Sequence, residues 1–177
     1  MIARLLGDKG VREYIQAGKL INKNGNIAQL HLVGSRDSNP NCLSQDEIDE
    51  WENIDWLTWY NKTSDVRPFI KNSHVYVLPS YREGTPRTVL EAMSMGRPII
   101  TTDVPGCRET VVDGSNGYLV TARNIKELKS AMMKFIESPD LLSDMSKQSR
   151  KIAEQKYDVK KVNEDMMNAL ALNQNDE

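Results

Sequence analysis

The feature that most constrains the fold is a regular alternation of short strand patterns with helical patterns, separated by turn residues. Apolar and β-branched runs at 28–34, 74–79 and 97–102 predict strands, and apolar spacing at 11–21 and 125–137 predicts helices. Strands that are separated by helices form parallel pairs, so the sequence predicts an α/β fold with a doubly wound parallel sheet. The remaining expected elements are strands at 2–3, 54–57 and 118–120, and helices at 44–51, 66–72, 85–96, 141–155 and 159–172.

The chain has the length of one domain. Its 177 residues suffice for a single hydrophobic core. We expect this domain at residues 1–157, followed by a C-terminal helix and a frayed tail at 158–177. The abrupt start at Met1 favours a fragment of a longer protein, or a natural chain shortened at its front.

Composition argues against several kinds of partner. The net charge is only −2 and the basic residues are scattered, so the sequence indicates neither a nucleic-acid tract nor a polybasic membrane anchor. No apolar run approaches the roughly eighteen residues of a membrane span. Cys42 and Cys107 provide no disulfide framework and no signal peptide opens the chain, which favours a cytoplasmic protein.

The segment "YREGTPRTVLEAMSMG", residues 81–96, predicts a helix with a defined start and end. Thr85 is expected at the N-cap and Pro86 at the first helical position, where its missing N–H costs nothing. Gly96 is expected to end the helix. Ligands of parallel sheets bind beyond the carboxyl ends of the strands, so this helix start should face a ligand cleft.

Two glutamates mark this segment. Glu83 stands at the strand-to-helix turn, and Glu91 lies about 7.5 Å further along the helix axis. That separation is comparable to the one between the sugar and the ribose of a nucleotide sugar, although Glu91 could equally be a solvated helix residue. Free backbone amides at the helix start suit phosphate or sugar oxygens, and they belong to Gly84, Thr85, Arg87 and Thr88.

Cations are expected on the same side of the sheet. Arg4 and Lys9 follow the first strand and open its helix, where they could grip a diphosphate or be an ordinary exposed pair. The sequence has no Cys/His spacing for zinc, no Asp-x-Asp and no glycine-rich nucleotide motif, so we expect no metal and no cofactor. His31 and His74, the only histidines, both adjoin strand residues, which argues against a histidine base.

Three segments, taken in order, resemble a known enzyme family. They are "ARLLGDKGVREYIQAG", "LVG" and the long segment from "VYVLPSYREGTPRTVLEAMSMG" to "NGYLV". They are similar to the C-terminal, donor-binding domain of the bacterial retaining glycosyltransferases of family 4, also called glycosyl transferases group 1. The resemblance covers residues 1–155. It implies a Rossmann-like domain that is one lobe of the two-lobed GT-B architecture.

The resemblance also implies roles for the charged residues. Arg4 and Lys9 match the basic pair that binds the donor diphosphate. Glu83 matches the first glutamate of the family's Glu-x7-Glu motif, near the transferred sugar, and Glu91 matches the second, on the ribose hydroxyls. Arg4, Lys9 and the helix start would stabilise charge on the departing diphosphate, so the catalytic residues expected are Glu83, Arg4 and Lys9.

Further donor contacts follow from the same match. Backbone amides of Gly84 and Thr85 would reach sugar hydroxyls, and those of Arg87 and Thr88 would reach phosphate. The segment "LTWYN" corresponds to a loop that holds the base, which makes Trp59 and Tyr60 candidate neighbours of the base.

The loop "RDSNPNCLSQDEIDEWENIDWL" resembles a bacterial subgroup that builds surface polysaccharides, often from UDP-hexoses or UDP-N-acetylhexosamines. The implied function is transfer of such a sugar, with retention and without a metal, to a glycan or lipid-carrier-linked acceptor. An N-terminal lobe would bind the acceptor, and the full-length enzyme could work at the inner face of the plasma membrane. The last helix would run toward that lobe, so its apolar face should be exposed here.

Two other interpretations stay open. The chain could be a nucleotide-sugar-binding module without catalysis, or a split-enzyme subunit that needs a separate N-terminal lobe. A related sugar-nucleotide epimerase is disfavoured by the scarcity of histidines and by the spacing of the two glutamates.

Overall fold

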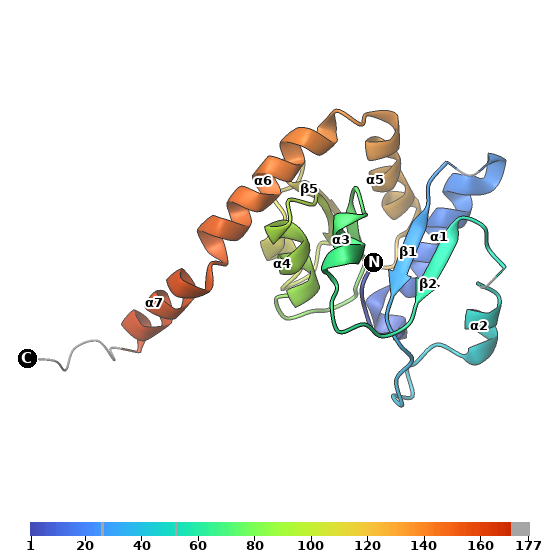
Figure 1. Cartoon of the computed structure of the whole chain (residues 1–177), viewed down its shortest axis with the longest axis horizontal. Helices are drawn as coiled ribbons and strands as arrows, with labels where there is room; N and C mark the ends of the chain where they lie inside the picture. The colour runs from blue at the N-terminus through green and yellow to red at the C-terminus, as the bar shows by residue number, and fades with distance from the viewer. Residues whose placement is uncertain (26, 52, 171–177) are drawn as a thin grey trace, which may run out of the picture.

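The computed structural model describes residues 1–25, 27–51 and 53–170. Strands and helices alternate along the chain, as the sequence predicts (Figure 1). The strands are β1 (Leu30–Val33), β2 (Leu57–Tyr60), β3 (Tyr76–Leu78), β4 (Ile99–Thr102) and β5 (Gly117–Val120). The helices are α1 (Val11–Ile21), α2 (Gln45–Asp49), α3 (Arg67–Lys71), α4 (Arg87–Ser94), α5 (Ile125–Glu137), α6 (Leu141–Lys156) and α7 (Val159–Ala169). Short 3-10 turns are η1 (Gly7–Lys9), η2 (Asn22–Asn24) and η3 (Arg108–Thr110).

All the paired strands are parallel. β1 and β2 form one sheet, and β4 lies between β3 and β5 in a second sheet. Residues 1–3 link the two sheets, because Ile2 bridges Val33 of β1 while its carbonyl accepts a hydrogen bond from the Tyr76 hydroxyl of β3 at 3.1 Å. The strand predicted at 2–3 is therefore a single bridge, while the predicted α/β class with parallel strands and C-terminal helices is confirmed.

The second sheet forms the centre of the core. Every residue of β3 and β4 is buried. The polar residues of β4 are satisfied by neighbouring backbone: the Thr101 hydroxyl donates to the Leu78 carbonyl at 2.8 Å, and the Thr102 hydroxyl donates to the Ser80 carbonyl. Helices complete the core by pairing, α1 with α5 and α4 with α6 (Figure 1).

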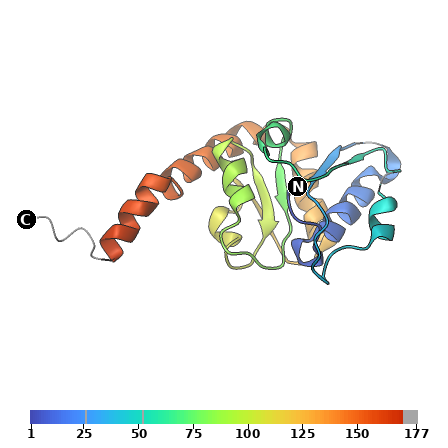
Figure 2. The ribbon, with the colours of Figure 1, turned by 60° about the horizontal axis from the view of Figure 1, so that its bottom comes forward.

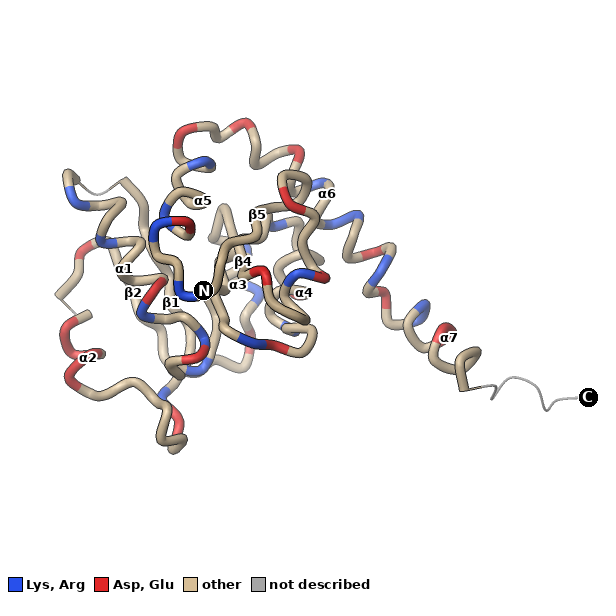
Figure 3. The backbone as a smooth tube through the Cα atoms, turned by 180° about the vertical axis from the view of Figure 1, so that it is seen from behind, with Lys and Arg blue, Asp and Glu red and all other residues tan. Residues whose placement is uncertain are grey.

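The C-terminal helices extend from this body. α6 leads away from the sheets, and α7 projects beyond the end of α6 in both Figure 1 and Figure 2. No residue of α7 is buried, its exposed apolar side chains include Val159, Met166 and Met167, and the C-cap Leu170 is exposed as well. The expected exposure of this apolar face is confirmed as far as residue 170, whereas the predicted helix end at 171–172 and the tail "NQNDE" lie outside the described residues. Figure 3 shows Lys and Arg interspersed with Asp and Glu along both helices.

Two sequence predictions about element boundaries are wrong. The strand expected at 54–57 is β2, at Leu57–Tyr60, because Ile54 belongs to the turns that follow α2: its amide donates to the Trp51 carbonyl, and its carbonyl accepts from the Leu57 amide. α4 begins at Arg87, one residue later than expected.

The start of α4 is set by Pro86. Its backbone is extended (φ −74°, ψ 113°) and its carbonyl accepts from the Val89 and Leu90 amides, so Pro86 is the N-cap and Thr85 lies outside the helix. The expected end is confirmed, since Met95 is the C-cap and Gly96 follows it in the left-handed conformation (φ +66°).

Candidate functional site

A small hollow of about 200 Å³ lies at the carboxyl end of β3. It is bordered by residues 2 and 3, by η1 and by the start of α4, which agrees with the expected position of a ligand cleft. Its lining residues are Ile2, Ala3, Lys9, Leu78, Glu83, Pro86, Arg87 and Thr88. Four of these were predicted from the sequence as donor-site residues: Lys9, Glu83, Arg87 and Thr88.

The central contact of the hollow joins Lys9 and Glu83. The Lys9 ammonium donates to Glu83 Oε1 at 2.7 Å, and the side chains are only 17% and 15% exposed. The Ser80 hydroxyl donates to the same carboxylate oxygen, also at 2.7 Å. Glu83 is therefore held by a cation and a neutral donor, and charge-assisted bonds of this kind are the stronger ones.

Close backbone packing brings these two residues together. Gly10 is left-handed (φ +72°), and a Cβ atom there would lie 2.1 Å from the Pro79 carbonyl oxygen. Only glycine fits this contact, which seats the η1–α1 corner directly on the loop that follows β3. Lys9, one residue before this contact, is thereby directed toward Glu83.

The start of α4 adds polar backbone to the hollow. The amides of Arg87 and Thr88 lie in the first turn of α4, where no carbonyl of an earlier helical turn can accept from them. No side chain caps this helix start. Gly84 and Thr85 lie in the exposed turn just before. Glu91 does not line the hollow, but as the i+4 neighbour of Arg87 it lies on the same helix face, about 6 Å further along the axis.

Arg4 does not join the other predicted residues. Its guanidinium donates to Asp37 Oδ2 at 2.8 Å, its side chain is 60% exposed, and it is absent from the lining of the hollow. This contact with Arg4 is the main reason that the pKa of Asp37 is lowered, with the Asn39 amide adding to it. The expectation that Arg4 and Lys9 converge on one crevice is therefore not met in this structure.

The aromatic candidates also differ from expectation. Trp59 and Tyr60 belong to β2 and not to a loop, because they pair with Leu32 and Val33 of β1. The Trp59 indole N–H donates to the Gly34 carbonyl at 2.8 Å, and the Tyr60 ring packs on His31 and Phe69. The predicted loop is wrong, and neither residue lines the hollow.

Ser80, Gly106 and Cys107 also lie around Glu83; Ser80 was expected at the cleft because it follows a predicted strand, whereas Gly106 and Cys107 were missed. Ser80 is fully buried and bonds to Glu83. Gly106 is left-handed (φ +81°), and a Cβ atom there would lie 2.1 Å from the Gly84 carbonyl oxygen and 2.4 Å from that of Glu83. Burial raises the pKa of the Cys107 thiol. Hydrogen bonds with Thr101 and Thr102 lower that pKa, and the nearby Glu83 charge raises it. The signal that could have indicated Gly106 is the Pro-Gly pair at 105–106.

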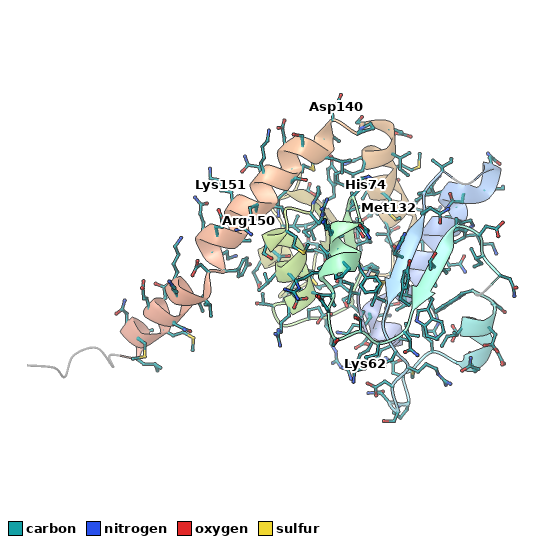
Figure 4. The ribbon with its side chains drawn as sticks, viewed as in Figure 1. Lys62, His74, Met132, Asp140, Arg150 and Lys151 are labelled. Atoms are coloured by element: carbon teal, nitrogen blue, oxygen red, sulfur yellow. The ribbon has the colours of Figure 1, made fainter. Side chains whose placement is uncertain are left out.

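A larger hollow of about 580 Å³ lies elsewhere, and its lining is mainly apolar. It is bordered by Met1, the start of β1, the segment before β3 and helix α5, and Figure 4 labels two of its lining residues, His74 and Met132. None of the predicted donor-site residues lines it. We therefore assign the candidate site to the smaller hollow, where charge and free amides meet.

Within residues 1–25, 27–51 and 53–170, no group of three or more His, Cys, Asp or Glu side chains could hold a metal ion. Over the same ranges, none of the helices combines the length and apolarity needed to cross a bilayer.

Comparison with known proteins supplies the family. The model of the glycosyl transferases group 1 family matches residues 1–152. The chain is 34% identical over 158 residues to a Campylobacter jejuni N,N'-diacetylbacillosaminyl-diphospho-undecaprenol alpha-1,3-N-acetylgalactosaminyltransferase, covering 89% of this chain and 40% of that protein. It is 30% identical over 156 residues to the Staphylococcus aureus capsular polysaccharide biosynthesis glycosyltransferase CapM, covering 88% and 41%. The chain thus spans about two fifths of the length of these relatives.

Solved structures agree on the fold. Anabaena Alr3699/HepE in complex with UDP superposes with a TM-score of 0.84 at 22% identity, over 96% of this chain and 47% of that one. The C-terminal domain of a glycosyl transferase group 1 protein (LpcC) from Francisella tularensis gives a TM-score of 0.78 at 21% identity, over 89% and 85%. The chain therefore belongs to the glycosyl transferases group 1 family, family 4 of the glycosyltransferases, and corresponds to the C-terminal lobe of the GT-B fold.

Proposed function

We propose that this chain is the donor-binding half of a retaining glycosyltransferase. Its donor is a UDP-linked hexose or N-acetylhexosamine, and the acceptor is a glycan or a lipid-carrier-linked sugar in surface polysaccharide synthesis. The observation that carries this proposal is the Lys9–Glu83 contact beside the uncapped start of α4. A cation and free amides suit a diphosphate, and a carboxylate suits sugar hydroxyls.

The relatives support the choice of donor and acceptor. By their names, one relative acts on a diphospho-undecaprenol-linked sugar and the other in capsular polysaccharide biosynthesis, and the similar Anabaena protein was solved in complex with UDP. This chain carries the charged pair and the helix start in the lobe that it shares with them. We propose the same class of substrate for it.

Each residue of the site then has a proposed role. Lys9 and the amides of Arg87 and Thr88 bind the diphosphate and stabilise the charge that develops on it as the sugar leaves. Glu83 and the amides of Gly84 and Thr85 face the transferred sugar. The other proposed donor contacts are Glu91 on the ribose, Trp59 and Tyr60 beside the base, and Arg4 on the diphosphate once its guanidinium has turned from Asp37.

The rest of the proposal concerns the protein in the cell. The acceptor binds to an N-terminal lobe in the remaining part of the enzyme, the reaction needs no metal, and the enzyme works in the cytoplasm, at the inner face of the membrane when the acceptor is lipid-linked. Without the other lobe, residues 1–177 bind donor but transfer little sugar. Residues 1–157 are the proposed nucleotide-sugar-binding domain, and 158–177 the proposed C-terminal helix and tail.

Calorimetry with UDP tests the proposal. Replacing Lys9 by Met removes a charge-assisted hydrogen bond worth about 1.5–3 kcal/mol, which corresponds to roughly 10- to 150-fold weaker binding. The matched control is Lys19→Met, since Lys19 is exposed in the last turn of α1 and lies outside the hollow. Folding of each variant is checked by its melting temperature.

Two results would contradict the proposal. One is a folded wild-type chain that binds neither UDP nor a UDP-sugar. The other is a Lys9→Met chain that binds UDP as tightly as the Lys19→Met control.

A further inference from the structure

Tyr81 joins the two segments that carry the central charges of the site. It lies two residues before Glu83, and its backbone N–H donates to the carbonyl of Asp8, the neighbour of Lys9, at 2.8 Å. Its hydroxyl donates to Glu13 Oε1, in the first turn of α1, at 2.6 Å. One residue of the Glu83 loop therefore bonds on both sides of the corner that presents Lys9.

The surroundings favour this arrangement. The guanidinium of Arg123 lies over the Tyr81 ring, 4.6 Å from its centroid, in a cation–π contact. Burial and then the hydrogen bond to Glu13 raise the pKa of Tyr81 to about 12, so the hydroxyl keeps its proton at neutral pH and remains a donor. Within the described residues, the second carboxylate oxygen, Glu13 Oε2, is buried without a hydrogen-bond partner.

A half-satisfied, partly buried carboxylate is a poor choice for stability alone. Leaving one oxygen of Glu13 unpaired costs free energy, and two apolar side chains of similar shape could fill the same space without that cost. The pair does supply direction, because a charge-assisted hydrogen bond fixes the tyrosine ring relative to α1.

The loop that carries Glu83 has further side-chain restraints: Lys9 and Ser80 bond to the Glu83 carboxylate, and Arg82 Nε lies 3.9 Å from Asp8 Oδ2. Within the described residues, the two that follow Glu83 are free of such restraints. Gly84 and Thr85 are exposed, and nothing lies within 4 Å of the position a Gly84 Cβ would occupy. On the far side of the loop, Gly106 packs on the carbonyls of Glu83 and Gly84. Tyr81 and Gly106 thus hold the loop from opposite ends.

We propose that Tyr81 and Glu13 are positioning residues of the donor site. Their hydrogen bond fixes the Glu83 loop against the η1–α1 corner, so that the Lys9–Glu83 pair is in place before donor arrives. Binding then requires less ordering of the loop, which raises affinity without any new contact to the ligand. This inference rests on the proposed donor-binding function.

The experiment is calorimetry of UDP with the 177-residue chain. Tyr81→Phe removes only the hydroxyl and is expected to weaken UDP binding by about 3- to 10-fold. Glu13→Ala should have the same effect, and the double variant should be no weaker than either single one. Glu13→Gln keeps an oxygen that can accept the hydroxyl and should bind UDP within about twofold of the wild type.

A second cycle shows whether the effect passes through Lys9. In a Lys9→Met background, Tyr81→Phe should cost little further affinity, because the group that it positions is gone. Additive losses would overturn the inference, and so would a Tyr81→Phe chain that melts lower but binds UDP as the wild type does. A wild-type chain that binds no UDP refutes the proposed function itself, whereas a binding wild type with an unaffected Tyr81→Phe variant refutes only the positioning role.

Discussion

Replacing Gly106 by alanine tests how tightly the Glu83 loop is held. Gly106 has a left-handed backbone (φ +81°), and an added Cβ would lie 2.1 Å from the Gly84 carbonyl oxygen. Close carbon–oxygen contacts in proteins are about 3.3 Å long, so relieving this contact requires the loop to move by about 1 Å. Gly114 provides the control, since it is also left-handed (φ +74°) but has nothing within 4 Å of its Cβ position.

The two variants separate strain from contact. An L-residue in the left-handed region costs about 1–2 kcal/mol, and both variants bear that cost. Gly106→Ala bears in addition about 1–3 kcal/mol for forcing a methyl group into packed backbone. Its free energy of unfolding should therefore fall by about 2–5 kcal/mol, against about 1–2 kcal/mol for Gly114→Ala. Urea denaturation measures both values.

The displaced loop should also affect the ligand. A shift of about 1 Å in a positioning group can cost on the order of a hundredfold in function, so Gly106→Ala should bind a UDP-sugar far more weakly than Gly114→Ala does. Equal stability losses for the two glycines would refute the contact argument. Equal UDP-sugar affinities would refute the inference that this contact positions Glu83.

Three further predictions concern charge and the C-terminal helix. Bonding to Arg12 lowers the pKa of Glu47 from 4.5 to about 2, so this pair stabilises the fold above pH 4.5 and loses its effect as the pH falls toward 2. The difference in urea midpoint between the wild type and Arg12→Gln should therefore narrow from pH 4.5 to about pH 2, and a constant difference would contradict this prediction. Asp37→Asn frees Arg4 from an exposed ion pair, so calorimetry should give UDP binding that is unchanged or at most about fivefold tighter, and a marked loss would contradict a role for a free Arg4. Ending the chain after Tyr157 removes α7, in which nothing is buried, and should leave the melting temperature nearly unchanged; a large drop in differential scanning calorimetry would show that α7 supports the fold.

Local signals explain what the sequence could predict. The apolar spacing at 11–21 coincides with α1, because one face of that helix is buried. Ser44 and Glu47 form the expected capping box, in which each side chain bonds to the backbone of the other residue. Such features depend on neighbours in the sequence, and therefore they can be read from it. Lys9 in η1 and Glu83 in the loop after β3 could be expected at one edge of the sheets, because each follows a predicted strand.

Long-range contacts explain what the sequence could not predict. Arg4 pairs with Asp37, 33 residues away, and no periodicity in the sequence indicates that choice of partner. The position of β2 depends on its pairing with β1, and aromatic residues such as Trp59 are common both in strands and in ligand loops. Gly106 acts through contacts with a loop more than twenty residues before it, so its role appears only in the folded chain.

The two cations differ in what donor binding would demand of them. An ammonium group carries three N–H donors, and within the described residues Lys9 uses one of them, on Glu83. Lys9 can therefore bind a phosphate oxygen while it still holds Glu83, so the diphosphate and the carboxylate near the sugar would be fixed by one side chain. Arg4 must first leave Asp37 and move its exposed side chain. The order of effects follows: substitution of Lys9 should weaken UDP binding more than substitution of Arg4, and the reverse order would place the diphosphate outside the hollow beside α4.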